Sequence, residues 1–377
     1  MYKVNDNYLK LPGSYLFAAI GKKVNTYAGL HPDKKIIRLG IGDVTQPLAP
    51  AIIKALHSAV DEMGNAETFH GYAPDLGYEF LRNAIVEGDF ASRGCDIQAD
   101  EIFVSDGAKC DCGNIQELFS LDNKIAVCDP VYPVYVDSNV MAGRTGTYDA
   151  DAETWSDVIY MPCTLENGFV PQIPEKMPEL VYLCFPNNPT GAIMEREDLE
   201  KIAKIVIEKD LFVLSDEIYS ELTYTDRHVT IASLPGMKER TVLINGFSKA
   251  YAMTGWRLGY AAAPEIILKQ MLKIHQYAIM CAPTTSQYAA SSALKNGDED
   301  VQNMRESYNQ RRRYLLHAFE EMNISCFEPQ GAFYTFPNIK RFGMSSDEFA
   351  TRLLKEEKVA VVPGTAFGDC GEGFVRI

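Results

Sequence analysis

Five short segments that follow apolar runs carry side chains able to do chemistry. They read Ser-Asp-Gly-Ala-Lys (105–109), Asp-Pro-Val-Tyr-Pro (129–133), Pro-Asn-Asn-Pro-Thr-Gly (186–191), Ser-Asp-Glu-Ile-Tyr (215–219) and Gly-Phe-Ser-Lys (246–249). Most lysines are solvated surface groups, but Lys249 stands among small and apolar residues, so we expect it to be buried. A buried lysine has a lowered pKa and becomes a nucleophile able to form a Schiff base.

Asp216 follows the apolar run Leu211–Leu214 directly. Considered alone, an acid at this position could simply cap the next helix. Beside a nucleophilic lysine it could instead keep the nitrogen of a heterocyclic cofactor protonated, which makes such a ring an electron sink.

Groups suited to a phosphate flank the lysine. Gly107, Ala108 and Lys109 open a predicted helix, where free N–H groups can bind phosphate. Ser248 and Arg257 can add a hydroxyl and a guanidinium fork. Each signal is weak alone, but together they predict a phosphate site next to Lys249.

Four further residues could complete this site. Tyr132 lies between two prolines and could stack on a flat cofactor, although a core tyrosine is equally expected. Asn188 and Tyr219 could hydrogen-bond an oxygen on the ring, and Asn188 could also merely form a turn. An arginine near a terminus usually lies on the surface, yet Arg376 is the residue type best suited to bidentate carboxylate binding.

The elements that must position these residues alternate along the chain. Strand-like apolar runs occur at Ile36–Leu39, Glu101–Val104, Lys124–Val127, Leu180–Phe185, Leu211–Leu214 and Thr241–Ile244. Amphipathic helix patterns occur at 50–63 (Ile52, Ile53, Leu56, Val60) and 195–209 (Leu199, Ile202, Ala203, Val206). This alternation predicts an α/β domain with a mostly parallel sheet, whose ligands lie at the carboxyl ends of the strands.

We expect three parts along the chain. Residues 1–35 would form an N-terminal arm and part of a small domain, and residues 36–285 a large cofactor-binding domain. Residues 286–377 would form a smaller α+β domain, with a charged helix at Arg305–Met322 and strand-like pieces at 331–336 and 358–362. Because the chain ends one residue after Arg376, we expect this small domain to be truncated.

Composition narrows the class of protein. The 377 residues include 36 Lys and Arg against 51 Asp and Glu, a net charge of −15 that disfavours nucleic acid and anionic membranes as partners. The sequence has no recognisable secretory signal, and its nine scattered cysteines are interpreted as reduced thiols of a cytoplasmic protein. No metal site is expected, because Cys110 and Cys112 lack a second pair or a nearby histidine.

Taken in this order, the loops resemble those of the class I and II aminotransferases of fold type I, which use pyridoxal 5′-phosphate. The resemblance extends over nearly the whole chain, and Pro186–Gly191 with Ser248, Lys249 and Arg257 is its most specific part. It implies a large domain with a mostly parallel central sheet and a smaller α+β domain.

The resemblance also implies roles for the residues singled out above. Lys249 would be the catalytic residue, bonding to the cofactor and carrying the transferred proton. Asp216 would contact the ring nitrogen of the cofactor, Asn188 and Tyr219 its ring oxygen, and Tyr132 its ring face. The phosphate would be held by Ala108, Lys109, Ser248 and Arg257. Gly246 stands where relatives usually have a phosphate-binding serine, so one hydroxyl contact would be missing.

Further implied roles concern the substrate and a second subunit. Tyr72 matches a tyrosine that reaches the phosphate of the other subunit, which implies a homodimer. Arg376 matches the arginine that binds the substrate α-carboxylate, with the backbone of Ile41 and Gly42 beside it. Contacts to amino acid and 2-oxo acid substrates are also expected from Lys109, Tyr132 and Asn188.

Segments 11–17, 38–50, 64–77 and 129–140 resemble the LL-diaminopimelate aminotransferases. These enzymes move an amino group from LL-2,6-diaminopimelate to 2-oxoglutarate in lysine biosynthesis. Tyr15 and Glu67 would then bind the distal end of the substrate, Glu67 from the neighbouring subunit, because that end carries an ammonium. The segment 245–260 is closer to the aspartate-type aminotransferases.

Three alternatives stay open at this point. A broader aspartate- or alanine-type aminotransferase would have no use for Glu67. A cystathionine β-lyase-like enzyme would release pyruvate and ammonia from a sulfur-containing donor without any 2-oxo acid. A cofactor-binding regulator or inactive relative is the non-enzyme alternative, although the sequence has no basic helix-turn-helix segment.

Overall fold

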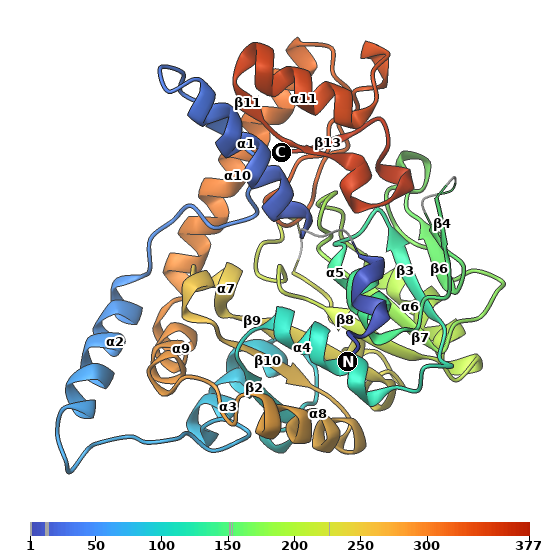
Figure 1. Ribbon diagram of the computed structural model, residues 1–377. Helices are drawn as coiled ribbons and strands as arrows, with labels where there is room; N and C mark the ends of the chain where they lie inside the picture. Colours follow the sequence, from blue (N-terminus) through green and yellow to red (C-terminus); the bar gives the residue numbers. More distant parts are fainter. Residues whose placement is uncertain (1, 12–14, 151, 153, 226) are drawn as a thin grey trace.

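A seven-stranded sheet forms the centre of the computed structural model, which describes residues 2–11, 15–150, 152, 154–225 and 227–377 (Figure 1). In spatial order its strands are β2 (Ile102–Ser105), β10 (Gly259–Ala262), β9 (Thr241–Gly246), β8 (Phe212–Asp216), β7 (Leu180–Cys184), β3 (Ile125–Asp129) and β6 (Val158–Pro162). Strand β10 runs antiparallel to β2 and β9, and the other neighbours are parallel. The sheet is therefore mostly parallel, as predicted.

Helices cover both faces of this sheet, so its strands are buried almost throughout. The covering helices include α3 (Glu79–Ile85), α4 (Ala108–Asn114), α5 (Val134–Ala142), α6 (Arg196–Glu208), α8 (Glu265–Ala278) and α9 (Thr284–Asn296). Strands buried on both faces are continuous apolar runs, which is why five of the six predicted strands occur here within two residues of their expected ends. The prediction missed β6 and β10.

The remaining predicted strand, 36–39, lies outside the sheet. It forms β1 (Ile37–Arg38), which pairs in parallel with β11 (Val359–Ala360) near the C-terminus. The expected strand at 331–336 is wrong: this segment makes only an isolated bridge between Thr223 and Gly331. The remaining strands are β12 (Val362–Pro363), which pairs with β13 (Val375–Arg376), and β4 (Tyr148–Asp149), which pairs with β5 (Thr154–Trp155).

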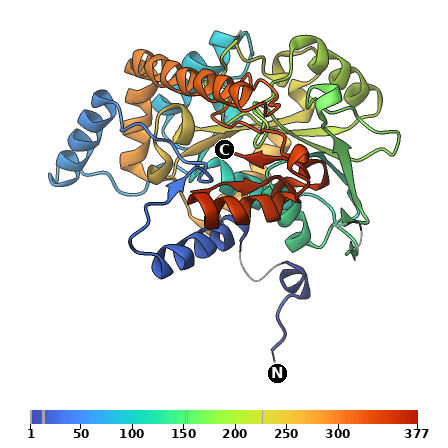
Figure 2. The same ribbon diagram turned by 90° about the horizontal axis from the view of Figure 1, so that it is seen from above.

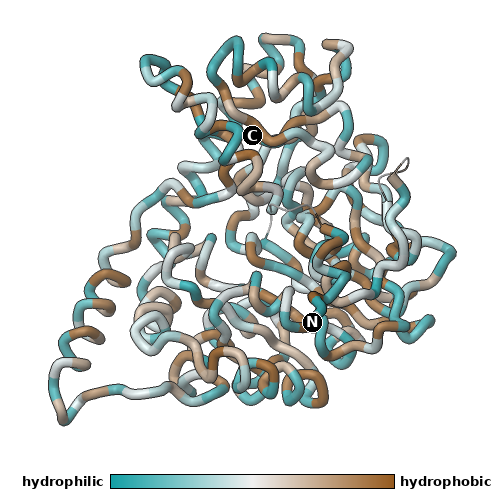
Figure 3. Tube along the Cα trace, viewed as in Figure 1, coloured by the Kyte–Doolittle hydropathy of each residue, from teal (hydrophilic) through white to brown (hydrophobic). Residues whose placement is uncertain are grey.

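The two predicted helices are confirmed, with a correction to one apolar stripe. In α6 all four predicted residues are buried. In α2 (Pro50–Met63) Ile52 and Leu56 are buried against α9, but Ile53 and Val60 are 42% and 60% exposed. Figure 3 shows apolar segments recurring along α2, which lies at the edge of the molecule. The stripe is wider than the surface that α9 covers.

The N-terminal helix packs on the C-terminal part of the chain, as Figure 2 shows for α1 (Leu16–Leu30) and α11 (Ser346–Glu357). Val24 of α1 forms a small core with Leu354 and Ala360. The charged helix predicted at 305–322 is α10 (Asp298–Glu321), and α7 (Phe247–Ala250) completes the α-helices of the described residues. The division into domains at 36–285 and 286–377 stays a prediction. No helix in the described segments is long and apolar enough to cross a membrane.

Candidate active site

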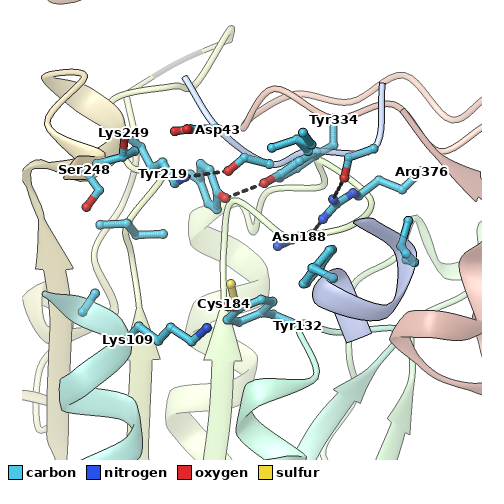
Figure 4. Close-up of a pocket in the computed structure, with 18 of the residues that line it drawn as sticks. Asp43, Lys109, Tyr132, Cys184, Asn188, Tyr219, Ser248, Lys249, Tyr334 and Arg376 are labelled. Atoms are coloured by element: carbon cyan, nitrogen blue, oxygen red, sulfur yellow. Dashed lines mark hydrogen bonds between the residues drawn. The ribbon is translucent and has the colours of Figure 1, made fainter. Parts of the chain in front are cut away.

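A cavity of about 590 Å³ opens at the carboxyl ends of β7, β8 and β9 (Figure 4). The predicted residues that line it are Ile41, Gly42, Ala108, Lys109, Tyr132, Asn188, Asp216, Tyr219, Ser248, Lys249, Arg257 and Arg376. They come from positions more than 300 residues apart in the chain, yet they face one space. The parallel sheet explains this, because the carboxyl ends of its strands meet at one edge.

Lys249 lies in α7, directly after β9. Its Nζ donates a hydrogen bond of 2.8 Å to the backbone oxygen of Gly42 and lies 5.5 Å from the ring centroid of Phe333. Burial lowers the pKa of Lys249 to about 8, since the cavity solvates an ammonium poorly. At a pKa of about 8, about a tenth of the amine is uncharged at pH 7 and can act as a nucleophile, far more than for a lysine in water.

Asp216 ends β8 and is buried at the floor of the cavity. Its Oδ2 accepts a hydrogen bond of 2.7 Å from the Tyr135 hydroxyl, and its Oδ1 accepts one of 3.1 Å from the Ile218 N–H. The helix-capping alternative is wrong, because residues 218–221, which follow Asp216, form a turn and not a helix. Burial raises the pKa of Asp216, and a cation placed beside it would favour its ionised form.

The phosphate-binding candidates lie together at the start of α4. Gly107, its N-cap, has φ +126°, and a Cβ added there would lie 2.8 Å from Nη2 of Arg257. Glycine therefore lets the guanidinium approach the N–H groups of Ala108 and Lys109, which have no acceptor within the helix. Ser248 lines the same cavity.

Gly246 stands where a further hydroxyl was expected, and its neighbours explain the absence of a side chain. A Cβ at this position would lie 2.9 Å from the Cα of Gly259 and 3.0 Å from the backbone oxygen of Leu258. In this chain β9 and β10 approach too closely at Gly246 to admit a serine.

Tyr132 and Lys109 lie opposite Lys249 across the cavity (Figure 4). The Tyr132 hydroxyl is 2.8 Å from the hydroxyl of Tyr15, and Nζ of Lys109 lies 4.1 Å above the ring of Tyr15. Tyr15 thus belongs to the rim of the cavity through its contacts. The preceding residues 12–14 of the same predicted segment lie outside the described residues.

Arg376 is buried, so the expectation that an arginine near the terminus lies on the surface is wrong here. Its Nη1 donates to Oδ1 of Asn188 at 2.8 Å and its Nη2 to the backbone oxygen of Gly40 at 2.9 Å. Its Nε has no hydrogen-bond partner, and within the described residues no carboxylate pairs with it. A buried cation without an anion is suited to binding a carboxylate ligand.

The contact between Arg376 and Asn188 also orients the amide of Asn188. Because the amide oxygen accepts from Arg376, the amide nitrogen of Asn188 is the group left to donate into the cavity. Tyr219, the other residue expected to contact a ring oxygen, is also buried, and Figure 4 shows its side chain between Lys249 and Asn188.

Three aromatic residues of the site were missed by the sequence analysis. The rings of Tyr334, Phe367 and Phe17 surround the Arg376 guanidinium, with centroids 4.4, 4.8 and 5.0 Å from Cζ. They come from three separate segments, so only the aromatic cluster Phe333-Tyr334-Thr335-Phe336 could have drawn attention to one of them.

Glu67 and Tyr72 do not line this cavity. Both lie in the segment between α2 and α3, at the outer edge of the molecule, and Tyr72 is 82% exposed. Their predicted contacts are with the site of a second subunit, so this single chain leaves those contacts as predictions.

The groups around the cavity fit pyridoxal 5′-phosphate, an aldehyde on a pyridine ring that carries a hydroxyl and a phosphate. Lys249 offers an amine for the aldehyde, Asp216 a buried acid for the ring nitrogen, and Arg257 a cation beside open N–H groups for the phosphate. A buried arginine remains for a substrate carboxylate. These features define a pyridoxal-phosphate-dependent enzyme of fold type I.

Comparison with known proteins specifies the family. A family model described as "Aminotransferase class I and II" matches residues 34–377, and the chain belongs to this family of pyridoxal-phosphate-dependent aminotransferases. An LL-diaminopimelate aminotransferase of Agathobacter rectalis is 48% identical over 386 aligned positions that cover all of this chain and 95% of the relative.

Solved structures agree with this assignment. L,L-Diaminopimelate aminotransferase from Chlamydomonas reinhardtii superposes with a TM-score of 0.91 at 31% identity, covering 100% of this chain and 94% of that chain. An aromatic aminotransferase from Pyrococcus horikoshii superposes with a TM-score of 0.83 at 36% identity, covering 94% of this chain and 93% of that chain. The likeness extends over both halves of the sequence.

Proposed function

We propose that this aminotransferase moves an amino group from LL-2,6-diaminopimelate to 2-oxoglutarate, in the cytoplasm and as a step of lysine biosynthesis. The observation that carries the proposal is a pair of basic side chains, the half-buried Lys249 and the buried Arg376, that face one cavity without a carboxylate partner among the described residues. A nucleophilic amine and a carboxylate-binding cation are the two groups that an amino acid substrate requires.

Each residue then has a separable task. When bound, pyridoxal phosphate supplies an electron sink for the bond between the substrate Cα and its hydrogen. Lys249 would take the proton from the substrate Cα and return it to C4′ of the cofactor, two bonds away, which is general acid–base catalysis worth about two to four orders of magnitude. Asp216 holds a proton at the ring nitrogen, and Arg376 fixes the substrate carboxylate so that the Cα hydrogen faces the amine.

The choice of diaminopimelate rests on the relatives and on the rim of the cavity. Two of the relatives described above, from Agathobacter rectalis and Chlamydomonas reinhardtii, are named for that activity. Tyr15 and Lys109 lie at the rim of the cavity, where the distal end of a long substrate would reach. That end bears an ammonium as well as a carboxylate. We propose that Glu67 of the partner subunit contacts the ammonium.

We further propose that two copies of the chain associate through the face that carries α2 and the segment after it. Large apolar side chains are exposed there, among them Val60, Phe69 and Tyr72, and apolar surface of this kind is a common feature of subunit interfaces. Association would bring Glu67 and Tyr72 towards the cavity of the other copy. Sedimentation equilibrium of the purified chain should give twice the mass of 42.0 kDa.

The proposed donor is tested by comparing Glu67→Gln with Asp61→Asn, a matched control that removes another exposed acid near the end of α2. We expect Glu67→Gln to lower kcat/KM for LL-diaminopimelate about 10- to 100-fold, because a hydrogen bond to a charged group is worth about 1.5–3 kcal/mol. The Glu67→Gln variant should turn over aspartate as fast as the wild type does. The Asp61→Asn variant should keep the wild-type kcat/KM for both donors.

The alternatives give different outcomes in the same assay. If Glu67→Gln lost activity equally towards aspartate and towards diaminopimelate, the result would favour a broader aminotransferase. Release of pyruvate from cystathionine without any 2-oxo acid would favour a β-lyase. Lys249→Ala should abolish turnover and the absorbance of lysine-bound cofactor, and normal transamination by this variant would contradict the proposal as a whole.

A further inference from the structure

Tyr334 lies in the segment between α10 and α11 that was expected to be a strand. Its side chain is buried and reaches the cavity from the C-terminal part of the chain. There it contacts Tyr219 after β8, Arg376 in β13 and Gly42 after β1. One side chain therefore joins three separate segments of the site (Figure 4).

The hydroxyl of Tyr334 lies 2.7 Å from the hydroxyl of Tyr219. Each hydroxyl has a single hydrogen, so only one of the two can donate in this contact. If Tyr334 donates, the hydrogen of Tyr219 is free to point into the cavity. No other hydrogen bond of either hydroxyl is found within the described residues, so either hydroxyl can be the donor in this contact until a ligand binds.

The ring of Tyr334 has a second contact, with the guanidinium of Arg376 at 4.4 Å from the ring centroid. A cation held over an aromatic ring in a dry site is stabilised by the negative face of the ring. Phe17 and Phe367 make the other aromatic contacts, so loss of the Tyr334 ring would open only one side of the guanidinium.

Gly42 keeps the hydroxyl of Tyr334 in this position. A Cβ at Gly42 would lie 2.4 Å from the Tyr334 oxygen, so only glycine leaves room for the hydroxyl. The backbone oxygen of Gly42 also accepts the hydrogen bond from Lys249. Tyr334 is thus packed against the backbone that contacts the candidate catalytic lysine.

We infer that Tyr334 is a positioning residue with two functions, one for its hydroxyl and one for its ring. The hydroxyl donates to Tyr219, so that Tyr219 donates to the ring oxygen of the cofactor. The ring braces Arg376 for the substrate carboxylate. This inference rests on the proposed aminotransferase function, and the two functions are separable because Tyr334→Phe removes the hydroxyl alone.

The first test is a spectroscopic pH titration of the bound cofactor. The absorbance of the bound cofactor changes when the nitrogen that links it to Lys249 loses its proton. A hydrogen bond donated to the ring oxygen stabilises this deprotonated form, so it lowers the pH at the midpoint of the absorbance change. Loss of the Tyr334 hydroxyl weakens this donor, and we expect Tyr334→Phe to raise the midpoint by about 0.5 pH unit. Its KM for the amino donor should stay within about twofold of the wild type, since the ring contact with Arg376 is retained.

Two further variants separate the hydroxyl from the ring. In Tyr334→Leu the ring contact is also lost, and we expect the Kd of a dicarboxylate inhibitor to rise about tenfold in addition to the shift in midpoint. Tyr224→Phe is the matched control: this tyrosine packs against the buried cluster that contains Tyr219 and Tyr334, but its hydroxyl donates to the backbone oxygen of Ala332. Its midpoint and Kd should equal those of the wild type.

Identical midpoints in Tyr334→Phe and wild type would overturn the role of the hydroxyl, and unchanged inhibitor binding in Tyr334→Leu would overturn that of the ring. If Tyr334→Leu does not fold, Tyr334→Phe still decides the first point. Failure of the proposed function is distinguishable, because the wild-type protein would then transfer no amino group to 2-oxoglutarate, whereas the absorbance midpoints and inhibitor Kd values do not depend on that transfer.

Discussion

Lys249 places a basic group where a charge is poorly solvated, and Lys249→Met should therefore stabilise the cofactor-free protein at neutral pH. Burial lowers the pKa of Lys249 from 10.5 to about 8. At about 1.4 kcal/mol for each pH unit, holding the ammonium in the cavity at pH 7 costs about 3 kcal/mol. Methionine has a similar length and no charge, but it loses the hydrogen bond to Gly42, worth about 1 kcal/mol. The expected net gain is about 2 kcal/mol.

The dependence of this gain on pH follows from proton binding. Because the pKa of Lys249 is lowered by folding, the folded wild type binds fewer protons than its unfolded chain between about pH 8 and 10.5. Its stability relative to the variant therefore rises across this window. The advantage of Lys249→Met should be full below pH 8 and lost by about pH 10.5.

The assay is urea unfolding of cofactor-free protein at pH 7 and pH 10, at one protein concentration. Lys204→Met serves as the control, since the Lys204 side chain is 76% exposed and its replacement should change stability by less than about 0.5 kcal/mol. Two results would refute this prediction. One is a Lys249→Met variant that is less stable than the wild type at pH 7, and the other is a gain in unfolding free energy that is the same at pH 7 and pH 10.

Three other substitutions test the site and its support. Asp216→Asn should leave the fold intact and lower kcat by about 100-fold or more, because the ring nitrogen loses its charged partner; an unchanged rate would exclude that role. Arg376→Lys should raise KM for amino donors about 10- to 100-fold, since an ammonium lacks the bidentate fork, and an unaltered KM would place carboxylate binding elsewhere. Arg93→Met should cost about 3–5 kcal/mol in urea unfolding, because it leaves the carboxylate of buried Asp89 without its ion-pair partner. Combining it with Asp89→Asn should recover part of that loss, and no recovery would contradict the pairing.

The strands that hold Asp216 and Lys249 were predictable because a strand buried on both faces is a short continuous apolar run. Strand β10, Gly259–Ala262, was missed because it is built of small residues and one tyrosine, which carry little apolar signal. The segment 331–336 failed in the opposite sense. Its aromatic residues suggest a strand, but Tyr334 and Phe333 are used to fill the space around Tyr219 instead.

The amino-acid sequence by itself determined the chemistry: a lysine, an acid and phosphate-binding groups follow successive apolar runs, and parallel strands must bring such loops to one edge of the sheet. Residue types and their order carry that information locally. Tertiary structure alone decided that Arg376 is buried among three aromatic rings. It also decided that Tyr334 contacts both the Tyr219 hydroxyl and the Arg376 guanidinium. Those contacts bring together residues from both ends of the chain, and no local pattern specifies which distant side chains will share one desolvated space.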